Sequence, residues 1–154
     1  MSDPIIRFHR APTSGPTIIT GLRKSLVPAT PTPILQVDIT QTLIPPDPVP
    51  DNSWFGELHF AVEDIDEVGG DVQIRGGSAN VAVAFKAPAT WNTAQAQNAT
   101  NAGTAGVVNV AFTWTTAGNI ATLNVTATPT VIVPTRLEIT YFLLYASHPA
   151  FTYL

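Results

Sequence analysis

Proline is distributed unevenly along this chain, and that distribution limits what each part can fold into. Ten of the fourteen prolines lie among the first fifty residues. Proline fixes the backbone angle φ and has no amide hydrogen to donate, so it interrupts helices and central strands. We therefore expect residues 1–50 to form an extended arm and residues 51–154 to form a folded body.

The body contains short segments in which apolar and polar residues alternate, the pattern of half-buried β-strands. No stretch shows helical periodicity of useful length, and the turn residues at 116–119 predict a hairpin. The glycine pairs at 69–70 and 76–77 predict turns at both ends of a short strand. The strands are predicted at residues 34–43, 57–63, 71–75, 80–86, 107–115, 120–127 and 136–146. This pattern predicts an all-β fold, an antiparallel β-sandwich of jelly-roll type.

The charge of the chain is low and unevenly placed. Charged residues make up 12% of the chain, about half of the roughly 25% typical of soluble domains. Residues 1–30 carry Arg7, Arg10, Arg23 and Lys24 against Asp3, a net charge of +3, which leaves −7 for the rest of the total of −4. The arm of one copy is therefore complementary in charge to the acidic body of another, and the alternative is that these are ordinary solvated charges in a flexible tail. Four spread cations are few for neutralising phosphates, which disfavours nucleic acid as a partner.

Several classes of protein are disfavoured by what the sequence lacks. It has no cysteine, which removes disulfides and thiolate metal sites. Its beginning, Met-Ser-Asp-Pro, does not match a secretory signal, and no apolar run reaches eighteen residues. We expect synthesis in a host cytoplasm and no membrane partner.

The residues that carry chemistry do not form a catalytic pattern. The three histidines are isolated, and no serine lies in a Gly-x-Ser-x-Gly motif. We therefore expect no enzyme, no cofactor and no metal ion. The acidic run at residues 63–71 fails as an EF-hand loop, because Val68 and Arg75 stand where oxygen ligands are needed. A calcium site of another type in this turn stays open.

Two segments are candidates for binding. Residues 87–105 are rich in Ala, Thr, Asn and Gln and contain Trp91 as their only large side chain, which predicts a long loop. Trp91 is a candidate for stacking on a sugar or filling a pocket of a neighbouring copy, but packing on its own domain is the favoured interpretation. The chain ends in the apolar residues Phe151 to Leu154, which predicts a docked tail.

Residues 107–146 resemble a known class of proteins. The segments Phe112-Thr-Trp-Thr-Thr-Ala-Gly-Asn119, Ala121-Thr-Leu-Asn-Val-Thr-Ala127 and Arg136-Leu-Glu-Ile-Thr-Tyr141 resemble β-sandwich segments of bacteriophage virion proteins, in fibres and head decoration proteins. The resemblance covers about a quarter of the chain. It implies a jelly-roll-like body, symmetrical oligomers that are often trimers, and attachment to a capsid or tail. The absence of a repetitive shaft favours a compact decoration or capsid component.

The first hypothesis is therefore a decoration or cement protein on the capsid surface of a virion, bound to other copies of itself and to a major capsid protein. A second hypothesis is a receptor- or glycan-binding module, for a host-surface glycan, that uses the 87–105 loop. A third is the main subunit of a small capsid or filament. The residues expected to make inter-subunit contacts are Ile5, Ile6, Phe8, Ile18, Ile19, Leu22, Leu35, Phe151, Tyr153 and Leu154.

Overall fold

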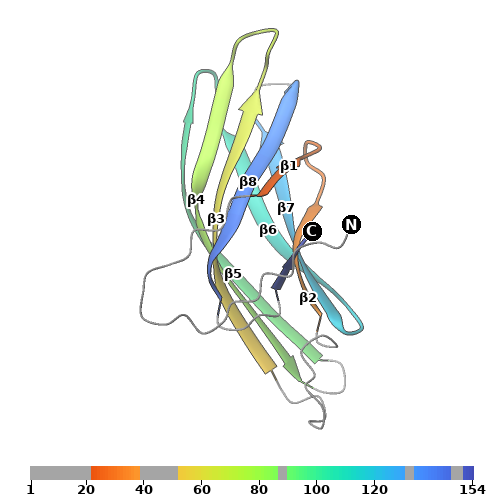
Figure 1. Ribbon diagram of the computed structural model, residues 1–154. Coiled ribbons are helices and arrows are strands. Elements are labelled where there is room, and N and C mark those ends of the chain that lie inside the picture. Colours follow the sequence, from red (N-terminus) through yellow and green to blue (C-terminus); the bar gives the residue numbers. More distant parts are fainter. Residues whose placement is uncertain (1–21, 39–51, 87–89, 131–133, 147–150) are drawn as a thin grey trace.

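The computed structural model describes residues 22–38, 52–86, 90–130, 134–146 and 151–154 (Figure 1). These residues form nine strands and no helix, so no helix in this part of the chain could span a membrane. The strands are β1 (Leu22–Ser25), β2 (Thr32–Asp38), β3 (Asn52–Ile65), β4 (Val72–Lys86), β5 (Thr90–Gly103), β6 (Val108–Ala117), β7 (Ile120–Pro129), β8 (Arg136–Ala146) and β9 (Phe151–Tyr153).

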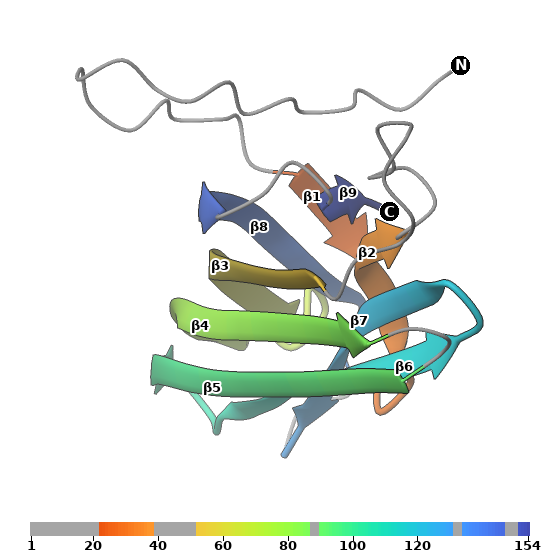
Figure 2. The ribbon, with the colours of Figure 1, turned by 90° about the horizontal axis from the view of Figure 1, so that it is seen from below.

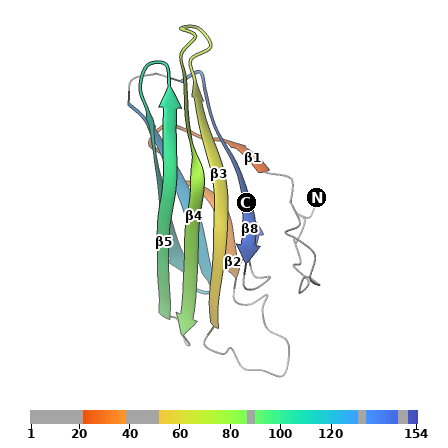
Figure 3. The ribbon, with the colours of Figure 1, turned by 90° about the vertical axis from the view of Figure 1, so that its left-hand side faces the viewer.

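The strands form two antiparallel sheets that pack face to face (Figures 2 and 3). The five-stranded sheet has the order β1-β8-β3-β4-β5, and the four-stranded sheet has the order β6-β7-β2-β9. The prediction of an all-β antiparallel sandwich is confirmed. As in a jelly roll, strands from opposite ends of the chain pair, here β1 with β8 and β2 with β7. The middle of the chain instead forms a meander, β3-β4-β5, and a hairpin, β6-β7.

The core lies between the sheets and follows from the alternation of side chains along each strand. On most long strands one face supplies apolar side chains to the core, while the other face is mainly polar or small, with Phe55, Val72 and Ile74 as exposed exceptions. The rings of Phe60 on β3 and Phe112 on β6 meet edge to face across the two sheets, with centroids 4.9 Å apart. The fully buried core residues include Ile34, Leu35, Leu58, Val62, Val81, Leu123, Val125, Ile139 and Tyr141.

The observed turns agree only in part with those predicted from the sequence. The predicted hairpin at 116–119 joins β6 to β7, and Gly118 has φ +55° there, the left-handed region that favours glycine. The predicted turn at Gly76-Gly77 is wrong, because both glycines lie inside the fifteen-residue strand β4. A glycine pair breaks a strand only when its neighbours allow a turn, and here β3 and β5 hold β4 straight on both sides.

The predicted boundary between arm and body at residue 50 is wrong for part of the arm. Residues 22–25 form β1 beside β8, and residues 32–38 form β2 between β7 and β9. Ile34, Leu35 and Val37 are fully buried in the core. The strand β2 tolerates Pro33 because the register with β7 shifts at that residue. The rest of the predicted arm, residues 1–21 and 39–51, lies outside the described residues.

The C-terminal residues dock on the chain's own sheet. The backbone of β9 pairs with β2, and the amide of Leu154 donates to the carbonyl of Ile34 at 3.1 Å. The hydroxyl of Tyr141, itself buried, donates to the carbonyl oxygen of Leu154 at 3.0 Å. The predicted docked tail is confirmed for the backbone, with the four-stranded sheet of the same chain as its partner.

Candidate functional site

An open trough of about 580 Å³ crosses the outer face of the five-stranded sheet. Its floor is the backbone of β4 at Gly76 and Gly77. Side chains from β3, β4, β5 and β8 surround this floor. The residues that line the trough and bear side chains of interest are His59, Ser78, Asn98, Thr100, Thr140 and Phe142.

The trough exists because small residues coincide across four paired strands. Thr140, Ala61, Gly76 and Thr100 lie opposite one another in successive strands, so this row has little volume and no side chain above β4. The adjacent row is Phe142, His59, Ser78 and Asn98. Two aromatic rings therefore stand at one side of the hollow, and an amide stands at the other.

The imidazole of His59 is held in place by two neighbours. Its ring stacks on that of Phe142, with centroids 5.2 Å apart and an interplanar angle of 14°. Its Nε2 lies 3.0 Å from Oε1 of Glu57, two residues along the same strand. The wall of the trough is thus a positioned ring rather than a free side chain. The sequence shows His59 as one of three isolated histidines, and it does not predict the trough, because the rows of the trough are set by strand register.

Gly76 and Gly77 differ in what surrounds them. A Cβ on Gly76 would make ordinary contacts, the closest 3.4 Å from the carbonyl oxygen of Phe60. A Cβ on Gly77 would collide with the carbonyl oxygen of Asn98 and would lie 2.7 Å from Cα of Ala99. Gly77 therefore permits the close approach of β4 and β5, whereas Gly76 leaves space in the trough.

Side-chain hydrogen bonds join β5, an edge strand of the five-stranded sheet, to β6, an edge strand of the other sheet, and to the turn that follows β6. We call this contact the seam. Nε1 of Trp91 donates to the carbonyl of Gly118 at 2.8 Å, and the amide of Gln97 donates to the carbonyl of Val110 at 2.9 Å. In the other direction, Nε1 of Trp114 donates to the carbonyl of Ala94 at 3.3 Å. These bonds satisfy backbone groups that an exposed sheet edge would otherwise offer to other chains.

The predicted loop at 87–105 is wrong, because residues 90–103 are the edge strand β5. Its Ala and Asn residues have low strand propensity, but fourteen successive pairs with β4 hold the segment extended. Trp91 lies opposite Phe85, its ring meets that of Phe85 at 4.9 Å, and it packs against the core. Of the two interpretations of Trp91, packing on its own domain is the one that the structure supports.

One side of the sandwich carries no charge. The 49 residues from 87 to 135 contain no Asp, Glu, Lys, Arg or His, and they include all of β5, β6 and β7. We call the surface of these three strands the uncharged side. Its outward residues on β6, among them Ala111 and Thr113, are exposed. The uncharged run is visible in the sequence, but only the fold shows that it forms one side of the molecule.

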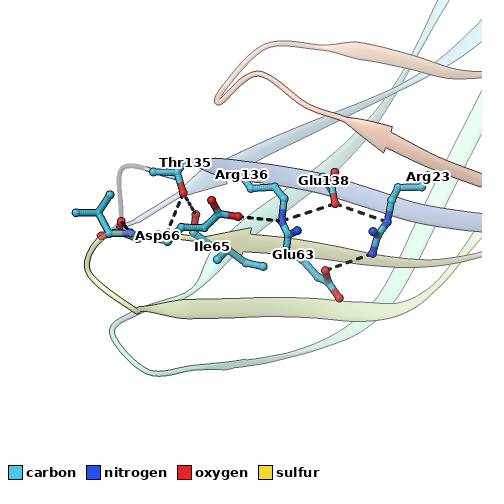
Figure 4. Close-up of polar contacts among 9 residues, drawn as sticks. Arg23, Glu63, Ile65, Asp66, Thr135, Arg136 and Glu138 are labelled. Atoms are coloured by element: carbon cyan, nitrogen blue, oxygen red, sulfur yellow. Dashed lines mark hydrogen bonds and ion pairs between the residues drawn. The ribbon is translucent and has the colours of Figure 1, made fainter.

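The charges gather instead on β1, β8 and the β3–β4 end of the five-stranded sheet (Figure 4). Arg23 lies 3.7 Å from Glu63 and 3.6 Å from Glu138, which is also 3.9 Å from Arg136. Arg136 in turn lies 4.0 Å from Glu67. These exposed pairs are individually weak. Together they form an alternating network that holds the edge strand β1 beside β8 and β3.

The acidic turn between β3 and β4 uses its oxygens internally. Oδ1 of Asp66 accepts from the amide of Val68 at 3.0 Å, and Oδ1 of Asp71 accepts from the hydroxyl of Thr104 at 2.8 Å. In the part of the chain that the structure describes, no three acidic or histidine side chains are grouped to hold a metal ion. Asp64, just before this turn, is fully buried. Burial, followed by the negative charge of Asp66, raises the pKa of Asp64 above its ordinary value of 3.8.

The structure places the predicted inter-subunit residues in different environments. Leu35 is fully buried in its own core, so its assignment as an inter-subunit contact is wrong, whereas Leu22 and Leu154 are exposed. Phe151 and Tyr153 lie on β9, whose backbone pairs with β2. The remaining candidates lie outside the described residues, namely Ile5, Ile6, Phe8, Ile18 and Ile19.

Comparison with known proteins gives one structural likeness. No family model and no curated protein matches the sequence. Among solved structures, the tailspike protein of the Acinetobacter phage vB_ApiP_P1 is similar to this chain, with 11% sequence identity and a TM-score of 0.41. The alignment covers 96% of this chain and 25% of the tailspike chain. This chain therefore spans about a quarter of the length of that protein.

Proposed function

We propose that this protein is a non-enzymatic structural component of a virion that assembles with other copies of itself through the uncharged side of its sandwich. The observation that carries this proposal is the charge distribution. All charged side chains of the described strands lie on β1, β2, β3, β4 and β8, and none lies on β5, β6 or β7.

Physical chemistry favours contact through such a side. The centres of protein interfaces are depleted in charged residues, because burying an unpaired charge costs several kcal/mol. Two copies that meet through their uncharged sides bury no charge at the contact. They also keep their net negative charges apart, since these lie on the opposite parts of each sandwich. A charged partner would find no complementary group there, which makes a further copy of this chain the favoured partner.

The placement in a virion rests on the resemblance of residues 107–146 to virion β-sandwich segments. The finer proposal is a decoration protein on a capsid surface, in trimers, with a major capsid protein as its second partner. The alternative is a main subunit that forms a particle or filament alone. Electron microscopy of the purified chain distinguishes them: regular particles or filaments indicate a main subunit, whereas a small oligomer that co-sediments with capsids indicates decoration.

Light scattering of the purified full-length chain tests the assembly itself. We expect a defined oligomer whose mass falls in Thr113→Lys, because the new ammonium group would be buried unpaired at the contact. A cost of roughly 3 kcal/mol corresponds to about 100-fold weaker association. The matched control is Ser25→Lys, which adds the same charge at an exposed position of β1, at the opposite edge of the five-stranded sheet from β5. A monomer at all concentrations, or equal loss of mass in both variants, contradicts the proposal.

A further inference from the structure

We propose that the trough on the five-stranded sheet binds a neutral saccharide ring, which lies over Ser78 and Gly76 with one face against the imidazole of His59. This site meets the uncharged side at Asn98, Ala99 and Thr100 of β5, while the rest of its lining lies on β3, β4 and β8. Trp91 does not line the site, and its ring packs against Phe85. The proposal does not depend on self-assembly.

The dimensions of the trough suit one ring. Neighbouring strands lie about 5 Å apart, so β3 and β5 are separated by about 10 Å across β4. Side chains stand on both sides of that gap, with His59 on β3 and Asn98 on β5. Between them on β4 lies the small side chain of Ser78, and Gly76 in the adjacent row has no side chain. A volume of about 580 Å³ lies within the range of small-molecule sites. A flat ring therefore fits over the small residues Ser78 and Gly76, with the imidazole on one side and the amide on the other.

The chemistry of the lining narrows the class of ligand. The lining residues include no Asp, Glu, Lys or Arg, so a strongly charged ligand would find no counter-charge. They include two threonine hydroxyls, a serine hydroxyl and the amide of Asn98. A purely apolar ligand would bury these polar groups without a hydrogen bond, and each buried group would weaken the binding free energy. A ring that carries hydroxyl groups on its edge and C–H bonds on its face satisfies both requirements.

The aromatic side of the trough, formed by His59 and Phe142, is already held in the orientation that such a ring needs. One face of His59 is covered by Phe142, and its Nε2 lies 3.0 Å from Oε1 of Glu57. These two neighbours together fix the orientation of the imidazole. The trough extends from His59 over β4 toward Asn98. A positioned ring loses little conformational freedom when a ligand binds to it, which favours binding at an open surface.

Saturation-transfer difference NMR on the full-length chain tests the proposal, because this method detects weak binding and tolerates large assemblies. The probes are glucose, galactose, mannose and N-acetylglucosamine, with sialic acid as the charged comparison. We expect a signal from at least one neutral sugar that exceeds the signal from sialic acid. The signal should be lost in Gly76→Val, which fills the trough, and kept in Ala84→Val, an exposed position on the same face of β4.

A second variant keeps the test valid if Gly76→Val does not fold. His59→Ala removes the aromatic wall without adding volume, and the signal should be lost there too. The proposal is overturned if no neutral sugar gives a signal, or if the signal is equal in wild type and Gly76→Val.

Discussion

Asp64 on β3 and Gln73 on β4 lie directly opposite each other, and both side chains are fully buried. None of the four polar side-chain atoms of this pair has a hydrogen-bond partner. Burial and the negative charge of Asp66 raise the pKa of Asp64 above 3.8. The folded protein therefore holds the Asp64 proton more tightly than the unfolded chain does, and this proton contributes stability at low pH.

The stability of the protein should consequently depend on pH through Asp64. The free energy of unfolding should fall as the pH rises from about 3.8 through the raised pKa, because the carboxylate becomes charged in a buried position. Asp64→Asn should flatten this decrease and stabilise the protein at neutral pH by roughly 1–3 kcal/mol. Urea denaturation at a series of pH values measures both effects. Glu67→Gln, at an exposed acid of the same turn, should leave the decrease in place; an unchanged decrease in Asp64→Asn contradicts the assignment.

The two adjacent glycines of β4 should respond differently to the same substitution. Gly77→Ala should destabilise the protein by about 1–3 kcal/mol, because its Cβ collides with the backbone of β5. Gly76→Ala should be neutral or slightly stabilising, since its Cβ fits and alanine restricts the unfolded chain. Chemical denaturation of both variants measures the difference. Similar values for the two would show that β4 and β5 do not approach as closely as described.

The seam should contribute to stability through Trp91. Trp91→Ala should cost about 2–4 kcal/mol, because it removes the ring that packs against Phe85. Trp91→Phe keeps a ring and loses the donor to Gly118, which should cost about 1 kcal/mol. Trp114→Phe, which removes a longer bond of 3.3 Å in the same seam, serves as the comparison. If Trp91→Ala has no effect on the urea midpoint, the seam does not hold the two sheets together.

Truncation should show where the sandwich begins. A chain that starts at Leu22 keeps all nine strands and should retain the β-sheet circular dichroism spectrum and a cooperative thermal transition. A chain that starts at Trp54 lacks β1 and β2 and with them Ile34, Leu35 and Val37. Three fully buried side chains contribute roughly 1.5–3 kcal/mol each, which is a large part of the stability of a typical domain. We expect this shorter chain not to fold; cooperative unfolding of it would restore the boundary at residue 50.

Part of the site could have been predicted from the sequence and part could not. The uncharged run from 87 to 135 can be read directly from the residues. The trough cannot, because Gly76, His59 and Asn98 come from three strands and meet only through their pairing. A change of one residue in register would place each of these side chains on the opposite face of the sheet.

The sequence by itself determined that the chain forms strands, where most of them lie, and which of their faces are apolar, because a period of two in hydrophobicity is a local property. It also determined the hairpin at Gly118, since the left-handed conformation there is a local requirement. Only the tertiary structure decided that residues 90–103 are a strand, that Gly76 and Gly77 do not form a turn, and that β2 belongs to the core. In each of these cases the pairing with neighbouring strands outweighs the local preference, and that pairing joins residues far apart in the chain.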